Sequence, residues 1–154
     1  MASDSDIRLA QAGSDQAGQV ARLVHGLLAE LSGGDGPPLD EVADSTARLL
    51  EQGSIEAVLA FAGTRPVGVI TLNECAAIYA GGAFGEICEL YVDPEFRSQR
   101  VAPLLIAEAK AIGRRRGWRR LEVGAPDQPA WQRTLAFYLR EEFEEVGPRL
   151  KVVL

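Results

Sequence analysis

The segment from Glu89 to Ala102 carries the strongest chemical signal in the chain. Its letters, ELYVDPEFRSQRVA, describe an apolar strand, a turn with a proline, a basic loop and the start of an amphipathic helix. The first N–H groups of a helix have no partner inside it, and the helix dipole adds about half a positive charge at the same end. Arg97 and Arg100 add full charges beside these groups. The segment therefore predicts a site for an anion, and first of all for a ligand that carries phosphate.

The same segment resembles motif A of the GNAT family of N-acetyltransferases, in which a strand ending in Val leads to [RQ]-x-x-G-x-[GA] at the start of a helix. Arg97 fills the first position and Ala102 the last, whereas Arg100 stands where the family usually has Gly. The resemblance implies acetyl-CoA as co-substrate, with its pyrophosphate held by amides of the loop. The residues that it implies for binding the cofactor are Leu90, Tyr91, Val92, Arg97, Ser98, Gln99, Arg100, Val101, Ala102 and Trp131.

Several residues depart from the family pattern. Pro103 lacks an N–H and removes one donor from the anion site, although its φ suits the first turn of a helix. Trp131 stands where many relatives have an Asn that touches CoA, and Glu142 replaces the Gly before Phe143. These departures leave open a second interpretation, a GNAT-fold protein that binds an acyl-CoA without efficient transfer.

Transfer of an acetyl group to an amine requires a base that takes a proton from the ammonium. A lysine-like amine has a pKa near 10.4, so holding it neutral at pH 7 costs roughly 4–5 kcal/mol, and a carboxylate is the usual remedy. Glu86 lies six residues before Val92, where the resemblance implies the catalytic Glu of histone-type members, and Glu89 is the alternative. In a regular strand these two side chains point to opposite faces, but the family often bulges this strand, which would change that assignment.

Phe137 to Phe143, FYLREEF, resembles the F-Y-x-x-x-G-F element on the last helix of the family. The resemblance implies that the Tyr138 hydroxyl protonates the leaving thiolate of CoA. The alternative is a core aromatic residue, because Leu135, Tyr138, Leu139 and Phe143 also form an apolar stripe. A backbone N–H at the end of the strand formed by Leu90, Tyr91 and Val92 is the expected donor to the carbonyl oxygen.

Hydrophobic periodicity and turn residues predict the elements that must position these groups. The predicted ranges are a strand over 6–10, helices from 14 or 15 to 31 and over 39–51, strands over 55–61, 67–77 and 85–92, a helix over 101–116, a strand over 120–125, a helix over 126–142 and a strand over 149–154. The order β-α-α-β-β-β-α-β-α-β is that of the GNAT fold. We therefore predict an α/β (α+β) protein, with a mixed, mostly antiparallel central sheet, helices on both faces and a single domain over 1–154.

The composition of the chain excludes several broad classes of protein. The chain has 154 residues, a net charge of -6 and 47% hydrophobic residues, which argues for a globular domain and against a general nucleic-acid binder. No apolar run approaches the roughly 20 residues of a membrane span, and the polar, acidic start argues against a secretory signal, so we expect a cytoplasmic protein without a membrane partner. Cys75 and Cys88 are interpreted as reduced thiols in buried strands, and without a His/Cys cluster we expect no metal site.

The leading function is an acetyl-CoA-dependent N-acetyltransferase that acts on a primary amine of a small molecule or a protein. Antibiotic, polyamine, amino acid and protein acceptors remain open, as does a purely structural module. The resemblance implies that the acceptor binds near 32–39, near 79–84 and near the region after Ala125. Because family members often pair, a homodimer is also left open.

Overall fold

The computed structural model describes residues 6–126 and 130–154, and the chain divides into two compact units, Met1–Glu122 and Val123–Leu154. The elements before the boundary are β1 (Ile7–Ala12), η2 (Ser14–Gln16), α1 (Ala17–Ser32), α2 (Leu39–Glu51), β2 (Glu56–Ala62), β3 (Arg65–Ala77), β4 (Gly82–Val92), η3 (Pro94–Phe96) and α3 (Val101–Arg116). The short strand β5 (Leu121–Val123) spans the boundary, and α4 (Gln132–Arg140) belongs to the second unit.

A five-stranded sheet in the order β1-β2-β3-β4-β5 forms the centre of the first unit. Its first four strands are antiparallel neighbours. Beside β4, the Arg119 N–H donates to the Ala83 carbonyl at 3.3 Å and the Gly85 N–H to the Arg120 carbonyl at 3.0 Å. These two bonds advance together along both strands, so β5 runs parallel to β4 and the sheet is mixed.

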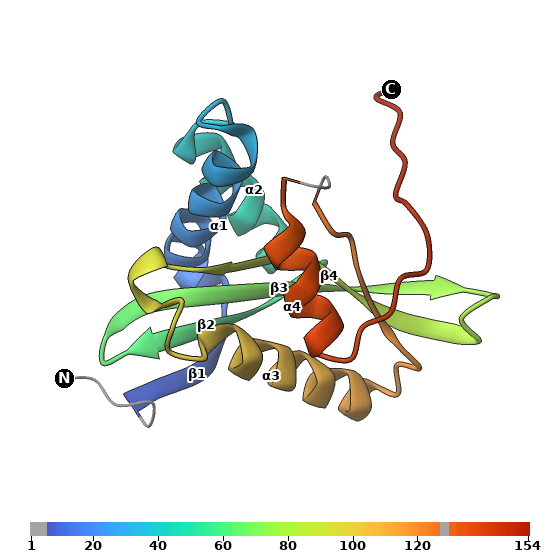
Figure 1. Cartoon of the computed structure of the whole chain (residues 1–154). Helices are drawn as coiled ribbons and strands as arrows, with labels where there is room; N and C mark the ends of the chain where they lie inside the picture. The colour runs from blue at the N-terminus through green and yellow to red at the C-terminus, as the bar shows by residue number, and fades with distance from the viewer. Residues whose placement is uncertain (1–5, 127–129) are drawn as a thin grey trace. The chain divides into compact units, whose positions relative to one another are not determined.

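Helices cover both faces of this sheet, with α1 and α2 on one face and α3 on the other (Figure 1). On the first face, Val20, Leu23 and Val42 of the helices pack with Leu59 and Val69 of the strands. On the other face α3 comes close to the sheet at one glycine: a Cβ on Gly68 would lie 2.9 Å from Val101 Cγ1 and 3.3 Å from Leu105 Cδ1. The absence of a side chain at Gly68 therefore fixes where α3 begins above the sheet.

The second unit contains α4, which ends in a Schellman motif. The Glu142 N–H donates to the Leu139 carbonyl at 3.3 Å, and the Phe143 N–H donates to the Tyr138 carbonyl at 3.0 Å. The motif brings the ring of Phe143 to 5.5 Å from that of Tyr138, edge to face. This hydrophobic contact is the one that usually accompanies such a helix end.

Most predicted elements are confirmed, together with the fold class. The bounds of α2 and α3 are those predicted, and the other strands and α1 shift by a few residues. The helix predicted over 126–142 begins at Gln132, and positions 127–129 lie outside the described residues.

The predicted strand over 149–154 is wrong, because this segment has no regular structure and Leu150, Val152, Val153 and Leu154 are exposed. Its β-branched, apolar composition suits a strand, but composition alone supplies no pairing partner.

Within the described residues, no helix is long and apolar enough to cross a membrane.

Candidate active site

The loop between β4 and α3 is braced by a residue from the start of β3. The Asp93 carboxylate accepts the N–H of Glu95 at 3.0 Å, which begins the short helix η3. Arg65 donates to Asp93 at 2.9 Å and to Glu95 at 3.2 Å, and its guanidinium lies 5.3 Å from the centre of the Phe96 ring. Arg65 therefore holds the loop at η3. An anionic ligand is expected to bind at the next part of the loop, which leads into α3.

Arg97 links this loop to α1. Its Nε donates to the carbonyl of Val92 at 3.0 Å, and its Nη2 donates to Glu30 Oε1 at 2.6 Å. The guanidinium also lies 5.4 Å from the centre of the Tyr91 ring. The side chain is thus committed to contacts within the protein, so what Arg97 would offer a phosphate is its charge rather than a direct bond.

Tyr91 anchors the end of β4 against α1. A Cβ on Gly26 would lie 2.8 Å from the ring of Tyr91, so the helix can pass at this distance only because residue 26 is a glycine. Burial raises the pKa of Tyr91, and the charge of Glu30 raises it further. Tyr91 is therefore a neutral phenol at physiological pH, and its ring helps to fix the strand end that leads into the loop.

The N-terminus of α3 presents hydrogen-bond donors. The Leu104 N–H donates to the Arg100 carbonyl at 3.3 Å, which leaves the N–H groups of Val101 and Ala102 as first-turn donors without an acceptor in the helix. Pro103 adds none. Beside them, Gln99 Oε1 is buried and has no hydrogen-bond partner within the described residues. The main-chain donors that the predicted anion site requires are therefore present, and the binding of an anion there stays a prediction.

Arg100 adopts a left-handed backbone conformation, with φ 61° and ψ 25°. Among the described residues the only other non-glycine with positive φ is Glu142, at 76°. These are the two positions where the sequence pattern lacks an expected glycine. Because a side chain in this region meets its own backbone, the chain keeps the backbone that Gly would favour and carries the strain of a larger residue.

Replacing Arg100 by glycine should therefore stabilise the protein. The left-handed conformation costs a non-glycine residue roughly 1–2 kcal/mol, which glycine avoids. The greater freedom of Gly in the unfolded chain lowers the stability of the folded state by about 0.5–1 kcal/mol and so offsets part of this gain. We expect Arg100→Gly to raise the free energy of unfolding by about 0.5–1 kcal/mol, measured by urea denaturation at constant m. Glu142→Gly should behave alike, whereas Arg100→Ala, which removes the methylenes and the guanidinium but keeps the Cβ, should not. An Arg100→Gly variant no more stable than Arg100→Ala would contradict this account.

A β-bulge changes the relation between the two candidate bases. Thr71 pairs with Glu89 and Leu72 with Ile87, so Cys88 is an additional residue in β4. Glu86 pairs with Asn73, which lies on the same side of β3 as Thr71 because the two are two residues apart. Glu86 and Glu89 therefore point to the same face of the sheet, the one covered by α1 and α2, and the opposite orientation expected of a regular strand is wrong.

The surroundings of the two carboxylates differ. The Thr71 hydroxyl donates to Glu89 Oε2 and accepts the backbone N–H of Glu89 at 3.0 Å. Cys75 Sγ is 3.9 Å from Glu86 Oε2. The interpretation of both cysteines as buried is wrong: Cys75 is half-buried, and Cys88 is exposed because the extra residue of a bulge leaves the regular packing of the sheet.

Tyr138 lies on α4 in the second unit. It is buried, and its ring is 5.3 Å from that of Phe137. Burial raises the pKa of Tyr138 to about 12, so the hydroxyl holds its proton at physiological pH, as a proton donor must. Trp131 is the residue before the first turn of the same helix. Its role in binding CoA stays a prediction, as does the role of Tyr138.

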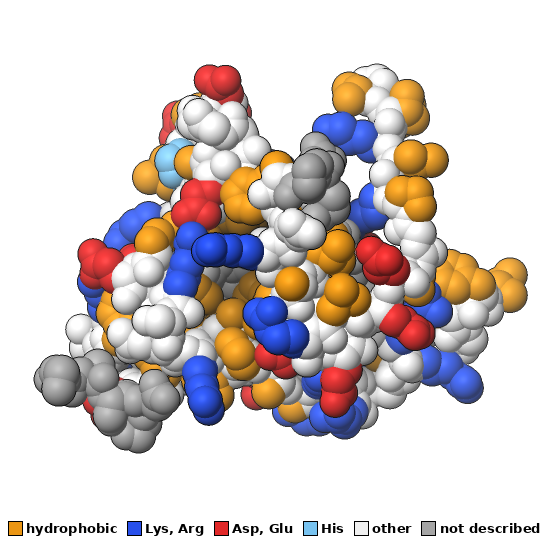
Figure 2. Space-filling view, viewed as in Figure 1, with side chains coloured by type: hydrophobic (Ala, Val, Ile, Leu, Met, Phe, Trp, Pro, Cys, Tyr) orange, Lys and Arg blue, Asp and Glu red, His pale blue; other side chains and the backbone are white. Residues whose placement is uncertain are grey.

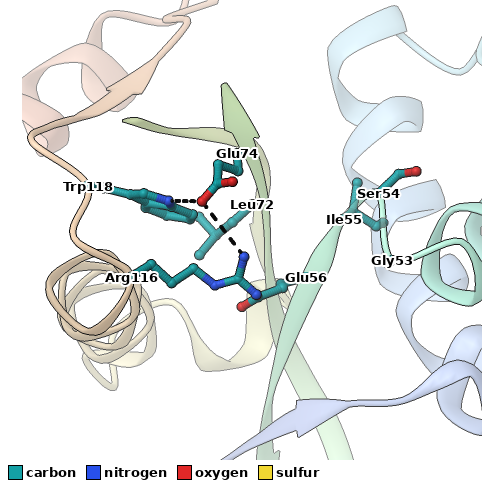
Figure 3. A pocket seen from close by; sticks show the side chains of 8 residues that line it. All are labelled: Gly53, Ser54, Ile55, Glu56, Leu72, Glu74, Arg116 and Trp118. Atoms are coloured by element: carbon teal, nitrogen blue, oxygen red, sulfur yellow. Dashed lines mark hydrogen bonds and ion pairs between the residues drawn. The ribbon is translucent and has the colours of Figure 1, made fainter. Parts of the chain in front are cut away.

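A pocket of about 250 Å³ lies elsewhere in the first unit (Figure 3). Arg116 forms an ion pair with Glu56 and lies 3.9 Å from Glu74, whose carboxylate accepts the Trp118 Nε1–H at 2.6 Å. Arg116 ends α3, and a helix of this length spans about 24 Å. The pocket is therefore remote from the donors at the start of that helix, and its charged lining consists of one arginine and two carboxylates.

Of the three segments expected to receive the acceptor, two belong to the first unit. Residues 32–39 connect α1 to α2, and 79–84 contain the turn of the β3–β4 hairpin. The hairpin ends in exposed apolar side chains, to which Ile78 and Tyr79 contribute (Figure 2, right). The Tyr79 hydroxyl donates to Glu122 at 3.0 Å. The acceptor role of these segments stays a prediction.

Comparisons with known proteins agree with the fold. The family described as Acetyltransferase (GNAT) family matches residues 26–141. Among curated proteins none matches the sequence significantly.

Solved structures resemble the chain over nearly its whole length. A possible acetyltransferase from Clostridium difficile 630 is 17% identical, with a TM-score of 0.82 over 96% of this chain and 97% of the other. An aminoglycoside acetyltransferase from an uncultured soil metagenomic sample is 17% identical, with a TM-score of 0.79 over 98% of each chain. A ribosomal-protein-alanine N-acetyltransferase from Brucella melitensis biovar Abortus 2308 is 20% identical, with a TM-score of 0.71 over 96% and 97%. At these identities the likeness shows the shared fold.

Proposed function

The chain belongs to the GNAT acetyltransferase family, and from this premise we propose that it is an acetyl-CoA-dependent N-acetyltransferase that acts on a primary amine. The observation that carries the proposal is the set of main-chain donors at the start of α3. Two first-turn N–H groups, of Val101 and Ala102, remain available there. The exposed side chain of Arg100 adds a positive charge beside them.

The residues of the site fit the chemistry of CoA. Its pyrophosphate is an anion that N–H donors and the helix dipole favour. Its pantetheine arm carries amide N–H groups, and the buried Gln99 Oε1 is an acceptor that needs such a donor. Leu90, Tyr91 and Val92 contribute main-chain groups beside the arm, and Ser98 contributes to the loop.

In the proposed reaction acetyl-CoA supplies the acyl group as a thioester. A carboxylate of the pair Glu86 and Glu89 takes a proton from the acceptor ammonium. The neutral amine then forms a bond to the acetyl carbon, an N–H of the 90–92 segment stabilises the oxygen, and the nitrogen loses its remaining extra proton to solvent as the carbon–sulfur bond breaks. Tyr138 donates its proton to the leaving thiolate, as the resemblance to the family implies.

The acceptor is proposed only as a class, a primary amine of a small molecule or a protein. Similar folds include an aminoglycoside acetyltransferase and a ribosomal-protein-alanine N-acetyltransferase. A screening panel should therefore contain an aminoglycoside and a peptide with an N-terminal alanine, together with a polyamine and a free amino acid. Release of the CoA thiol with any of them supports transfer.

Binding of acetyl-CoA can be tested separately by thermal shift. At about 100 times its Kd a ligand stabilises the fold by roughly 2.7 kcal/mol, which should raise the Tm by roughly 5–10 °C in a domain of this size. Ala102→Asp puts a carboxylate among the first-turn donors and should abolish the shift. Ala107→Asp, at an exposed position of the same helix, should keep it.

A wild-type protein that melts cooperatively and shows no shift with acetyl-CoA would overturn the proposal. A clear shift without thiol release on any amine would instead favour a GNAT-fold protein that only binds an acyl-CoA. Two observations favour this second candidate function, binding without transfer: the strained cap at Arg100 and the missing N–H donor at Pro103.

A further inference from the structure

Thr71, on β3, has a direct relation to one of the two candidate bases. Thr46 and Thr71 are the buried polar or charged residues of the described chain. The Thr46 hydroxyl donates to the Val42 carbonyl at 2.7 Å, an ordinary bond within a helix. The Thr71 hydroxyl instead donates to the carboxylate of Glu89 and accepts the backbone N–H of the same residue. One buried hydroxyl thus joins the main chain and the side chain of Glu89.

This contact depends on the bulge at Cys88. The extra residue Cys88 has no partner in β3, and the pairing resumes at Glu89 opposite Thr71, where Thr71 Oγ1 accepts the Glu89 N–H. Thr71 is only 1% exposed, and its β-branched side chain has few rotamers available. The hydroxyl therefore stays fixed and holds Glu89 Oε2.

Distance along the strand also separates the two carboxylates. Glu89 immediately precedes the segment Leu90–Val92, which we propose to support the acetyl carbonyl. Glu86 lies opposite Asn73, two residues along β3 from Thr71, or about 7 Å at the spacing of an extended strand. A base must come within hydrogen-bond reach of the attacking amine, and that amine must approach the same carbonyl.

We infer that Thr71 is a positioning residue that fixes Glu89, rather than Glu86, as the base for acetyl transfer, an inference that rests on the proposed function. Thr71 keeps its own proton throughout. The ammonium first passes one proton to Glu89 Oε1, which frees the lone pair of the nitrogen; the nitrogen then forms its bond to the acetyl carbon and loses its second proton to solvent. The value of Thr71 lies in holding the acceptor oxygen still, because catalytic groups act efficiently only when their orientation is fixed in advance.

Removal of the hydroxyl tests this role. Thr71→Val keeps the shape of the side chain, and we expect it to lower kcat about 10- to 100-fold with the KM for acetyl-CoA within about twofold. Thr71→Ser keeps the hydroxyl and should retain most of the activity. If Thr71→Val does not melt cooperatively, Thr71→Ala carries the same test.

A double-mutant cycle distinguishes positioning from general stability. In a Glu89→Gln background the base is absent, so Thr71→Val should cause no further loss of kcat. An equal loss in both backgrounds would overturn the inference, as would an unchanged kcat in Thr71→Val or a Thr71→Ser variant as impaired as the valine variant.

The experiments distinguish an error in the proposed function from an error in the role given to Thr71. If the wild-type protein releases no thiol with any amine of the panel, the proposed function fails and the role of Thr71 fails with it. If the wild type is active and only the pattern among the Thr71 variants differs from that expected, the acetyltransferase stands and Thr71 is a structural residue.

Discussion

Replacement of Glu89 by glutamine is expected to lower kcat for acetyl transfer by about 100- to 10,000-fold, the range for loss of a general base. Glutamine has nearly the shape of glutamate and can still accept the Thr71 hydroxyl, but it cannot take the proton of the acceptor. The reaction then depends on amine that is already neutral in solution. Because that fraction falls as the pH drops below the pKa of the amine, the deficit should be largest at low pH. Steady-state kinetics across pH measures it.

Glu86→Gln is the matched control for this prediction. It makes the same change of charge on the same face of β4, so a general electrostatic effect on a cationic acceptor would appear in both variants. We expect Glu86→Gln to raise the KM for the amine at most and to keep most of kcat. The reverse pattern would make Glu86 the base, as the resemblance to the family suggested, and would leave Thr71 without a role in catalysis.

The fold was predictable where local signals agree with packing. Helix α2 begins after Pro38 and α3 ends at Gly117, residues that favour those boundaries. The prediction of a terminal strand over 149–154 was wrong because a local signal was present without packing to support it. The apolar residues between Leu150 and Leu154 resemble a strand in composition, but a strand exists only where another backbone pairs with it, and composition does not show the partner.

The main-chain geometry around the candidate site was predictable, and its side-chain contacts were not. The helix-start donors followed from the sequence because a strand, a loop and a helix start are consecutive, and their role in binding an anion stays a prediction. The bulge at Cys88 could not be predicted, because one extra residue does not visibly change the hydrophobic pattern of β4. Thr71 and Arg65 were missed as well, since their partners Glu89 and Asp93 lie on another strand or its end. The missing glycines at Arg100 and Glu142 were the signal that could have revealed the two left-handed positions.

Replacement of Tyr138 by phenylalanine is expected to lower kcat by about 10- to 1000-fold if its hydroxyl protonates the thiolate of CoA, within and just below the usual range for acid–base catalysis. The change leaves the ring in place. The contacts with Phe137 and Phe143 involve the ring alone, so the helix end should be preserved and the loss should be chemical. Single-turnover kinetics, in which release of product does not contribute, provides the measurement. An unchanged rate there would make Tyr138 a core aromatic residue.

The alkaline stability of the same variant provides a control that does not depend on catalysis. Burial raises the pKa of Tyr138 to about 12 in the folded state, against about 10 for an unperturbed tyrosine. The folded state therefore favours the protonated phenol. The resulting stability is fully present below pH 10 and is lost as the pH rises toward 12, by about 2–3 kcal/mol in total. Tyr138→Phe cannot ionise, so between these pH values it should lose less stability than the wild type. Equal losses would show that Tyr138 ionises with an ordinary pKa in the folded protein, and its assignment as a buried proton donor would lose its physical basis.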